Sequence, residues 1–211
     1  MDNWMNYSEL LTLCQKRRSC RSFSHEPLSA EQIEKIRTIA LTSPYASGKK
    51  SWEIVTVTEK EIIARMALAV NNAAEKIAAG IETDYKDNFL SYAKYFRIFD
   101  SAPALFIPVF RISPVLTLML DTHGTGSLCN DTVKEISEWE RDNYVKSISC
   151  VAMLILLAAE SLGLSSCYMT GPLLAENELA AIINIKPGRS IGALIPVGYA
   201  NSEKKIPGRS K

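Results

Sequence analysis

One apolar stretch, residues 148–164, constrains the fold of this chain more than any other. It contains Glu160 and Gly163 and is shorter than the roughly 20 residues that a bilayer-spanning helix needs. Small residues recur at helical spacing between bulky apolar faces, which predicts a helix over residues 145–164. Because this helix is apolar on several sides, it must be buried, either inside its own domain or against a second copy of the chain.

Helix and strand patterns flank this stretch. Ser29 and Gln32 form a capping box that begins a helix, which must end before Pro44. Pro108 lies inside a strand pattern and indicates an edge strand or a bulge. Residues 113–131 show no clear period, and His123 to Gly126 within them are interpreted as a flexible connection. The other patterns predict helices over residues 7–17, 61–79, 84–100 and 173–185, strands over 52–58, 104–110 and 191–199, and a short strand with a turn over 165–172.

The composition is that of an ordinary folded protein. Apolar residues make up 47% and charged residues 22% of the 211 residues, which suits one large α/β domain with a substantial core. No repeat or linker-like segment divides the chain, so we predict a single domain over residues 1–211. The net charge of +1 argues against a dedicated nucleic-acid-binding protein. We expect no membrane span, and residues 1–6 lack the pattern of a signal peptide.

The cysteines indicate free thiols and no metal site. There are five, with no C-x-x-C spacing, and His25 and His123 are the only histidines. These residues do not form a zinc-type ligand set. The Gly-Thr-Gly that follows His123 lacks the lysine and the spacing of a phosphate-binding loop. An odd number of unpaired cysteines is typical of a reducing compartment, so we predict a cytoplasmic protein.

A basic cluster follows the first expected helix. Arg17, Arg18 and Arg21 stand within five positions, with Ser19 between them. Guanidinium groups offer a planar fork of donors that suits phosphate oxygens, and a hydroxyl can fill a remaining acceptor. The alternative is a solvated basic helix end, because cations near a helix C-terminus are stabilising without any ligand.

Residues 84–100 are polar but rich in aromatic side chains. Phe89, Tyr92 and Phe96 fall at helical spacing and predict a helix with an aromatic stripe. Such a stripe either packs into a core, covers the surface or stacks on a ligand, and the pattern leaves these alternatives open.

Five segments, taken in order, resemble the motifs of the FMN-dependent nitroreductase family, and together they cover nearly the whole chain. The resemblance implies an α+β fold in which helices surround a mixed, mostly antiparallel sheet. It also implies a homodimer with two FMN sites at the subunit interface. The segments are Arg17-Arg18-Ser19-x-Arg21, the loop from Ser43-Pro44-Tyr45 to Trp52, the helix over residues 148–164, Tyr168-Met169-Thr170-Gly171, and residues 194–199 together with Arg209.

The resemblance also assigns roles to individual residues. The FMN phosphate and the N1/O2 edge of its ring are expected to meet Arg17, Arg18, Ser19, Arg21, Lys205 and Arg209. A loop from the partner subunit is expected to cover the pyrimidine edge with Pro44, Tyr45, Gly48 and Lys50. The turn near flavin N5 is expected to contain Met169, Thr170 and Gly171, and we hypothesise that the Thr170 hydroxyl donates a hydrogen bond to N5.

The loop before Trp52 departs from the family pattern. Gly48, Lys50 and Ser51 stand where the family usually has Asn, Gln and Pro. The side-chain amide contacts to the ring are thereby lost, and Lys50 brings a charge toward the flavin or the substrate. These departures affect the substrate assignment more than they affect flavin binding.

The resemblance implies an FMN-dependent NADH or NADPH oxidoreductase. Hydride would pass from a transient nicotinamide to flavin N5 and then to a nitroaromatic, quinone or similar electrophilic acceptor in an alternating mechanism. No G-x-G-x-x-G unit is present that would hold a resident dinucleotide, and no catalytic triad is visible. The alternatives are reductive dehalogenation or flavin degradation, a non-catalytic flavin carrier, and a flavin-free interaction protein.

Overall fold

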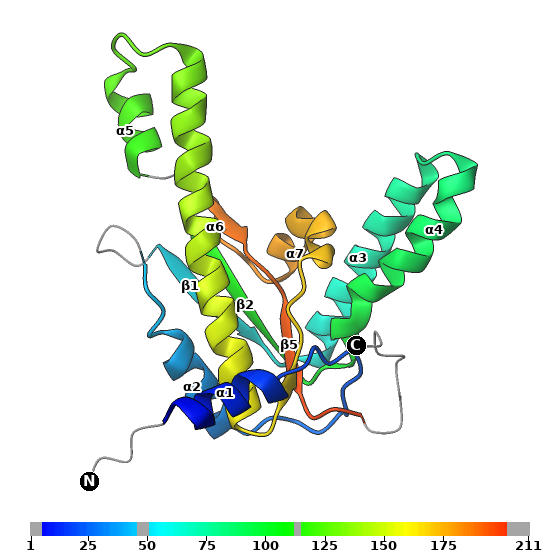
Figure 1. Ribbon diagram of the computed structural model, residues 1–211. Coiled ribbons are helices and arrows are strands. Elements are labelled where there is room, and N and C mark those ends of the chain that lie inside the picture. Colours follow the sequence, from blue (N-terminus) through cyan, green and yellow to red (C-terminus); the bar gives the residue numbers. More distant parts are fainter. Residues whose placement is uncertain (1–5, 46–50, 112–114, 202–211) are drawn as a thin grey trace.

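A five-stranded antiparallel sheet forms the centre of the computed structural model, which describes residues 6–45, 51–111 and 115–201. The strand order is β1-β2-β5-β3, and β4 also pairs with β2 (Figure 1). Every strand pair is antiparallel, and an isolated parallel bridge joins Ser19 to Ser166 beside β3. The α+β prediction is therefore confirmed. The strands are β1 (Trp52–Val57), β2 (Ala104–Arg111), β3 (Ser165–Ser166), β4 (Arg189–Ile191) and β5 (Ile195–Gly198).

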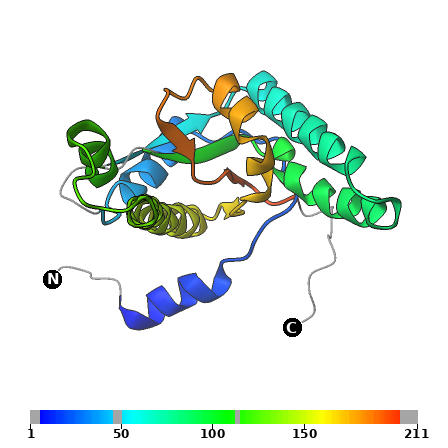
Figure 2. The same cartoon turned by 90° about the horizontal axis from the view of Figure 1, so that it is seen from above.

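Helices cover both faces of the sheet (Figure 2). On one face lie α2 and α6, and on the other lie α3, α7 and the 3₁₀ helix η2. Helix α1 projects from this layered body. The bounds are α1 (Tyr7–Lys16), α2 (Ala30–Ala40), α3 (Lys60–Ala79), α4 (Thr83–Ala93), η2 (Lys94–Ser101), α5 (Val115–His123), α6 (Asn130–Ser161), the 3₁₀ helix η3 (Gly171–Ala175) and α7 (Glu176–Ile182).

Strand β2 divides the hydrophobic core into two clusters. Its side chains alternate between the faces: Ala104 and Phe106 pack with α2 and α6, whereas Leu105 and Ile107 pack with α3 and α7. All four are fully buried. A strand buried on both faces is apolar at consecutive positions, and this is why its sequence shows little alternation.

Pro108 belongs to this central strand, so the edge-strand alternative is wrong, but the register with the facing strands shifts by one residue beside it, as the bulge alternative predicts. It stands opposite Ile54 of β1, and its carbonyl accepts a hydrogen bond of 2.8 Å from the amide of Gly192. On the other side of β2 the partner changes from β5 to β4 around this position. The expected single strand over residues 191–199 is therefore two strands, and the missing amide hydrogen of Pro108 falls at the break between them.

Gly192 makes that break possible. A Cβ atom there would lie 2.3 Å from Ile148 Cγ2 of helix α6 and 3.1 Å from the Pro108 carbonyl oxygen. No other residue type would let the backbone pass between helix and strand without displacing them.

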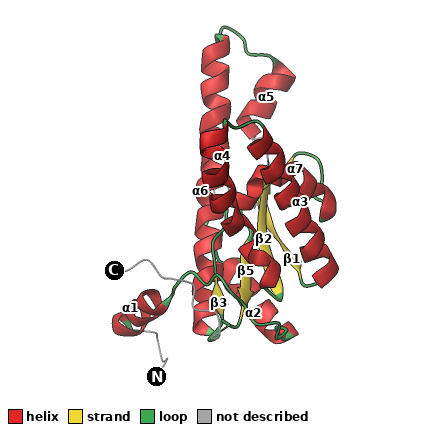
Figure 3. Ribbon diagram, turned by 90° about the vertical axis from the view of Figure 1, so that its right-hand side faces the viewer, coloured by secondary structure: helices red, strands yellow, loops and turns green. Residues whose placement is uncertain are grey.

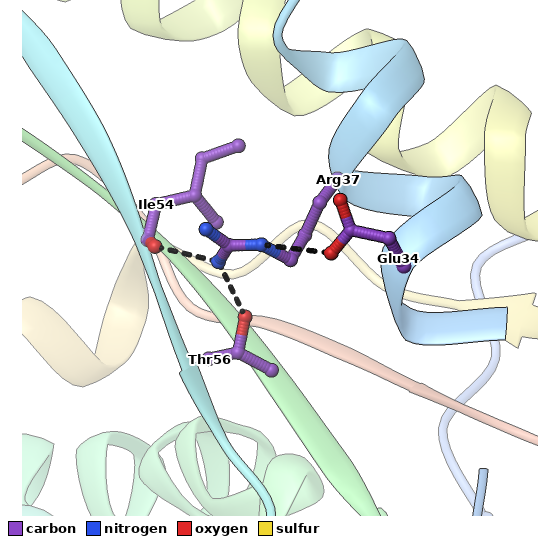
Figure 4. A network of polar contacts seen from close by, with 4 residues as sticks. All are labelled: Glu34, Arg37, Ile54 and Thr56. Carbon is purple, nitrogen blue, oxygen red and sulfur yellow. Dashed lines mark hydrogen bonds and ion pairs between the residues drawn. The ribbon is translucent and has the colours of Figure 1, made fainter. Parts of the chain in front are cut away.

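Helix α2 is fixed to the sheet by an arginine (Figure 4). Arg37 Nη1 donates to the Ile54 carbonyl at 3.0 Å and to Thr56 Oγ1 at 3.1 Å, while its Nε lies 3.8 Å from a Glu34 carboxylate oxygen. At the start of the same helix the predicted capping box of Ser29 and Gln32 is present. Local and tertiary polar contacts thus orient α2 against β1.

Helix α6 is longer than predicted and carries a second helix beside its first half. It begins at Asn130 and contains 32 residues, and α5 lies alongside its upper end (Figure 3). No helix was predicted over residues 115–123, and the connection expected over His123 to Gly126 begins where α5 ends. Glu140 of α6 accepts hydrogen bonds from the Leu116 amide at 2.9 Å and the Thr117 amide at 2.7 Å. The group that caps α5 thus lies more than twenty residues away in the sequence, where no local pattern reveals it.

Among the described helices, α6 is the one long and apolar enough to cross a membrane on length and composition alone. The core helix of a soluble protein meets the same criteria. Its apolar half, from Ile148 onward, packs against β2 and β5 in one of the two core clusters.

Candidate functional site

A cavity of about 550 Å³ opens where the basic segment, the junction of α4 with η2 and the chain after β3 converge. Three segments far apart in the sequence thus contribute to one site. Its lining consists of Arg21, Tyr92, Tyr95, Phe96, Ile98, Cys167, Tyr168, Met169, Thr170, Gly171 and Pro172. Among these, Arg21 is the only charged side chain.

Backbone hydrogen bonds hold the basic segment beside the sheet. Ser19 forms the parallel bridge with Ser166, and the Cys20 amide donates to the Ser166 carbonyl at 2.9 Å. Phe23 is buried in the core, and its amide donates to Ser101 Oγ at 3.3 Å. Because the segment is anchored at both ends, the Arg21 side chain is placed at the cavity.

Another part of the cavity is a turn fixed by a bridge to Leu194, just before β5. Met169 and Leu194 exchange two backbone hydrogen bonds of 3.0 and 2.9 Å. Thr170 follows, and its carbonyl accepts from the Leu173 amide at 3.0 Å as η3 begins. A Cβ atom on Gly171 would lie 2.3 Å from Phe96 Cδ1, so the Phe96 ring rests directly on the glycine backbone.

The thiol of Cys167 lines the cavity, and groups of the basic segment affect its pKa. Burial raises the pKa of this thiol, whereas the nearby Arg21 guanidinium opposes that rise. A hydrogen bond with Ser19 and the charge of Arg17 also lower the pKa, and Cys20 raises it. Arg17, Ser19 and Arg21 of the predicted anion site therefore all act on one cavity-lining residue.

Arg18 is used differently. Its Nη1 donates to the carbonyls of Gln15 and Arg17 at the C-terminal end of α1. Last-turn carbonyls of a helix lack intrahelical partners, and a cation satisfies them while it complements the helix dipole. For this residue the structure favours the alternative of a basic helix end.

Pro44 and Tyr45 are the described residues of the loop expected to come from a partner subunit, and they do not line this cavity within one chain. Pro44 and Tyr45 follow α2, which lies across the molecule from α4 in Figure 1. Neither is among the residues that line the cavity. Gly48, Lys50, Lys205 and Arg209 lie outside the described residues, so their roles stay predictions.

A protein-family comparison identifies the chain. The model described as "Nitroreductase family" matches residues 14–199. The chain belongs to the nitroreductase family. This confirms the resemblance read from the five segments.

The proteins similar to this nitroreductase-family chain are named for different activities. An iodotyrosine dehalogenase 1 homolog from Caenorhabditis elegans is 28% identical over 199 residues, which cover 90% of this chain but 54% of that protein. A BluB-like flavoprotein from Clostridium difficile 630 superposes with a TM-score of 0.79 at 20% identity and covers 96% of this chain and 95% of that one. A nitroreductase with bound FMN from Desulfitobacterium hafniense DCB-2 gives a TM-score of 0.68 at 21% identity, with coverages of 98% and 96%.

The cavity of this nitroreductase-family chain has the features that an FMN molecule needs. FMN joins a phosphate to a flat ring system, so its site must supply cations at one end and a narrow apolar slot at the other. Arg21 supplies a cation in the lining, and the charge of Arg17, which does not line the cavity, also acts on Cys167. Phe96, Ile98, Met169 and Pro172 in the lining supply apolar surface for the ring. The residues present therefore fit the group.

Sequence reasoning missed several lining residues. Tyr95, Ile98, Cys167 and Pro172 were not among the predicted site residues, although all line the cavity. The aromatic stripe was the one available signal for the α4 side, and it left stacking and packing undecided. No group of three or more His, Cys, Asp or Glu side chains that could hold a metal ion occurs in the described part of the chain.

Proposed function

We propose that this protein is an FMN-dependent oxidoreductase that takes hydride from NADH or NADPH and reduces a nitroaromatic, quinone or similar electrophilic acceptor. The observation that carries this proposal is the cavity that joins Arg21 to the turn at Thr170 and Gly171. FMN, when bound, supplies the capacity to accept and release hydride. Membership of the nitroreductase family, some of whose solved members bind FMN, supports the cofactor assignment.

In this proposal the protein binds the flavin, orients it and excludes water from the site. Arg17 and Arg21 bind the phosphate, and Ser19 supplies a hydroxyl beside them. The Thr170 hydroxyl donates a hydrogen bond at the ring edge. No carboxylate is found among the described lining residues, and the proposed chemistry depends on the orientation of the reacting groups.

We further propose that the working unit is a homodimer in which the partner's loop completes the site. Helix α1 buries none of its residues, and Tyr7, Leu10 and Leu11 are all exposed on it. Such an amphipathic helix favours a partner surface. We also propose a cytoplasmic location, since the described cysteines are all free thiols. Nucleic acid and membrane are not among the proposed partners.

The first test is the visible absorption spectrum of the purified protein, before and after NADH or NADPH is added without oxygen. A yellow protein that bleaches with either nucleotide supports the reductase. A yellow protein that keeps its colour would instead indicate a flavin carrier. A colourless protein that added FMN cannot restore would overturn the proposal.

Two arginine variants make this test residue-specific. Arg21→Ala removes a charged hydrogen-bond donor at the cavity, so FMN affinity should fall by about 1.5–3 kcal/mol, roughly ten- to hundredfold. Arg18→Ala is the matched control, because its guanidinium is bonded to carbonyls of α1 and should change affinity much less. Equal losses in a titration of apoprotein with FMN would contradict the proposed site.

The second candidate function is reductive dehalogenation of a halogenated aromatic compound. It is favoured by the relative from Caenorhabditis elegans, whose name states that activity, although this chain spans only about half of that protein. The test is halide release from an iodinated phenol by the dithionite-reduced protein without oxygen. Release at a rate matching flavin reoxidation would favour this candidate over quinone reduction.

A further inference from the structure

The junction of α4 with η2 presents an aromatic wall to the cavity. Tyr92, Tyr95 and Phe96 line it from this junction, and Tyr168 lines it from the chain after β3. The rings of Tyr92 and Phe96 meet edge to face, with centroids 5.0 Å apart and planes at 82°. Tyr92 is 63% and Tyr95 is 52% exposed, so much of both tyrosines is free to meet a ligand.

The wall is anchored by contacts with neighbouring elements. Phe99 in the same 3₁₀ helix is fully buried in the core cluster that contains α3. Arg97 Nη1 donates to Asn71 Oδ1 of α3 at 3.1 Å, and Arg97 also lies 3.6 Å from an Asp100 carboxylate oxygen. The Phe96 ring rests on the Gly171 backbone, which joins the wall to the turn that contains Thr170. A preorganised surface loses little entropy when a ligand stacks on it.

Exposure alone does not distinguish these tyrosines. Tyr85 lies on the same helix and is 65% exposed, yet it does not line the cavity. Tyr92 and Tyr95 differ from it because they converge with Thr170 and Gly171 on one space. Nor does any described residue of α5, the other projecting helix, line that space.

We propose that Tyr92 and Tyr95 are specificity-determining residues that select flat, ring-containing electron acceptors by stacking on them. This inference rests on the proposed oxidoreductase function and deepens it. It places acceptor selection on the junction of α4 with η2 and not on α5. Acceptors that exchange electrons without stacking should be insensitive to these side chains.

The test compares two acceptors on the flavin-loaded protein. The bound flavin is reduced with dithionite and mixed with 1,4-naphthoquinone or with ferricyanide, and the rate constant of reoxidation is measured by stopped flow. Tyr92→Leu and Tyr95→Leu should each lower the rate constant of reoxidation by naphthoquinone about two- to tenfold, the loss expected for one aromatic contact. The rate constant with ferricyanide should change by less than twofold in these variants. The matched control Tyr85→Leu should alter neither rate constant.

A binding measurement separates this inference from the proposed function. Naphthalene-2-carboxylate, which is redox-inert, is titrated calorimetrically into the oxidised protein, and Tyr92→Leu should weaken its binding by a similar factor. If the protein binds flavin but naphthoquinone reoxidises both tyrosine variants as fast as the wild type, this inference is overturned and the proposed oxidoreductase function is unaffected. An equal decrease in the rate constants with naphthoquinone and ferricyanide would also overturn this inference. A wild-type protein that binds no flavin refutes both, and its absorption spectrum shows this at the outset.

Discussion

The two halves of helix α6 behave as different structures in one continuous helix. From Ile148 to Ala159 the second half contributes all seven of the buried residues of α6. The first half, residues 130–147, contributes none and rises beyond the sheet beside α5 (Figure 1). Apolar side chains remain exposed on this projecting arm, which we define as α5 with residues 130–147; among them are Leu118, Met119 and Trp139.

The difference shows that helix formation and helix burial have separate causes. The second half is stabilised by its contacts with β2 and β5 in the core. The first half is continuous with it and adds one backbone hydrogen bond per residue without a new nucleation step. Its tertiary support comes from α5, which Glu140 caps. The arm should therefore open locally while the core half stays folded.

The largest expected effect comes from truncation in the core half. Ile155→Ala removes a fully buried side chain and should lower the free energy of unfolding by about 2–5 kcal/mol. Met153→Ala, on the exposed side of the same half, should cost less than about 1 kcal/mol. Urea denaturation measures both variants. Equal losses of unfolding free energy would mean that burial does not determine how much a side chain of this helix contributes to stability.

A smaller effect is expected where the arm is capped. Glu140→Gln replaces a carboxylate that binds two amides and the Thr117 hydroxyl, so it should destabilise α5 by about 1 kcal/mol. Hydrogen exchange should accelerate at Leu116 and Thr117, while core amides keep their protection. Glu138→Gln is the control, because that side chain is exposed in an ion pair with Lys134. Loss of protection throughout the protein would show that the arm and the core unfold together.

A still smaller effect is expected at the exposed surface of the arm. Trp139 is 58% exposed, so Trp139→Ala should change the free energy of unfolding by less than about 0.5 kcal/mol in dilute protein. If the loss instead grows with protein concentration, a second copy of the chain covers the arm. Thermal unfolding at several concentrations, together with sedimentation, distinguishes the two outcomes.

The last comparison uses cysteines and leaves stability unchanged. Cys129, just before α6, has its thiol pKa lowered by hydrogen bonds from the Thr132 hydroxyl and amide, whereas burial raises the pKa of Cys167. Since the thiolate is the reactive form, Cys129 should be alkylated at a lower pH than Cys167. Iodoacetamide labelling followed by mass spectrometry across pH 6–9 measures the order. Faster labelling of Cys167 would show that the cavity is open to solvent more often than the structure indicates.

Polar sequence signals predicted well when their partners were close in the chain. Ser29 and Gln32 stand three residues apart, and their capping box is present. Arg18 was assigned to the anion site, yet its guanidinium bonds to the carbonyls of Gln15 and Arg17. The basic motif identified a cation at Arg18, but it could not show which hydrogen-bond acceptors the guanidinium would reach.

By itself the sequence determined the buried half of α6, the α+β class, the family and the two segments that meet at the cavity, Arg17–Arg21 and Met169–Gly171. These depend on periodicity and on motifs whose members lie within a few positions of each other. Only the tertiary structure decided that α5 is a helix, that Pro108 lies in the central strand and that Tyr92 and Tyr95 line one cavity with Thr170. Each of these depends on contacts between residues tens of positions apart, because the folded sheet, and not the local chain, brings such residues together.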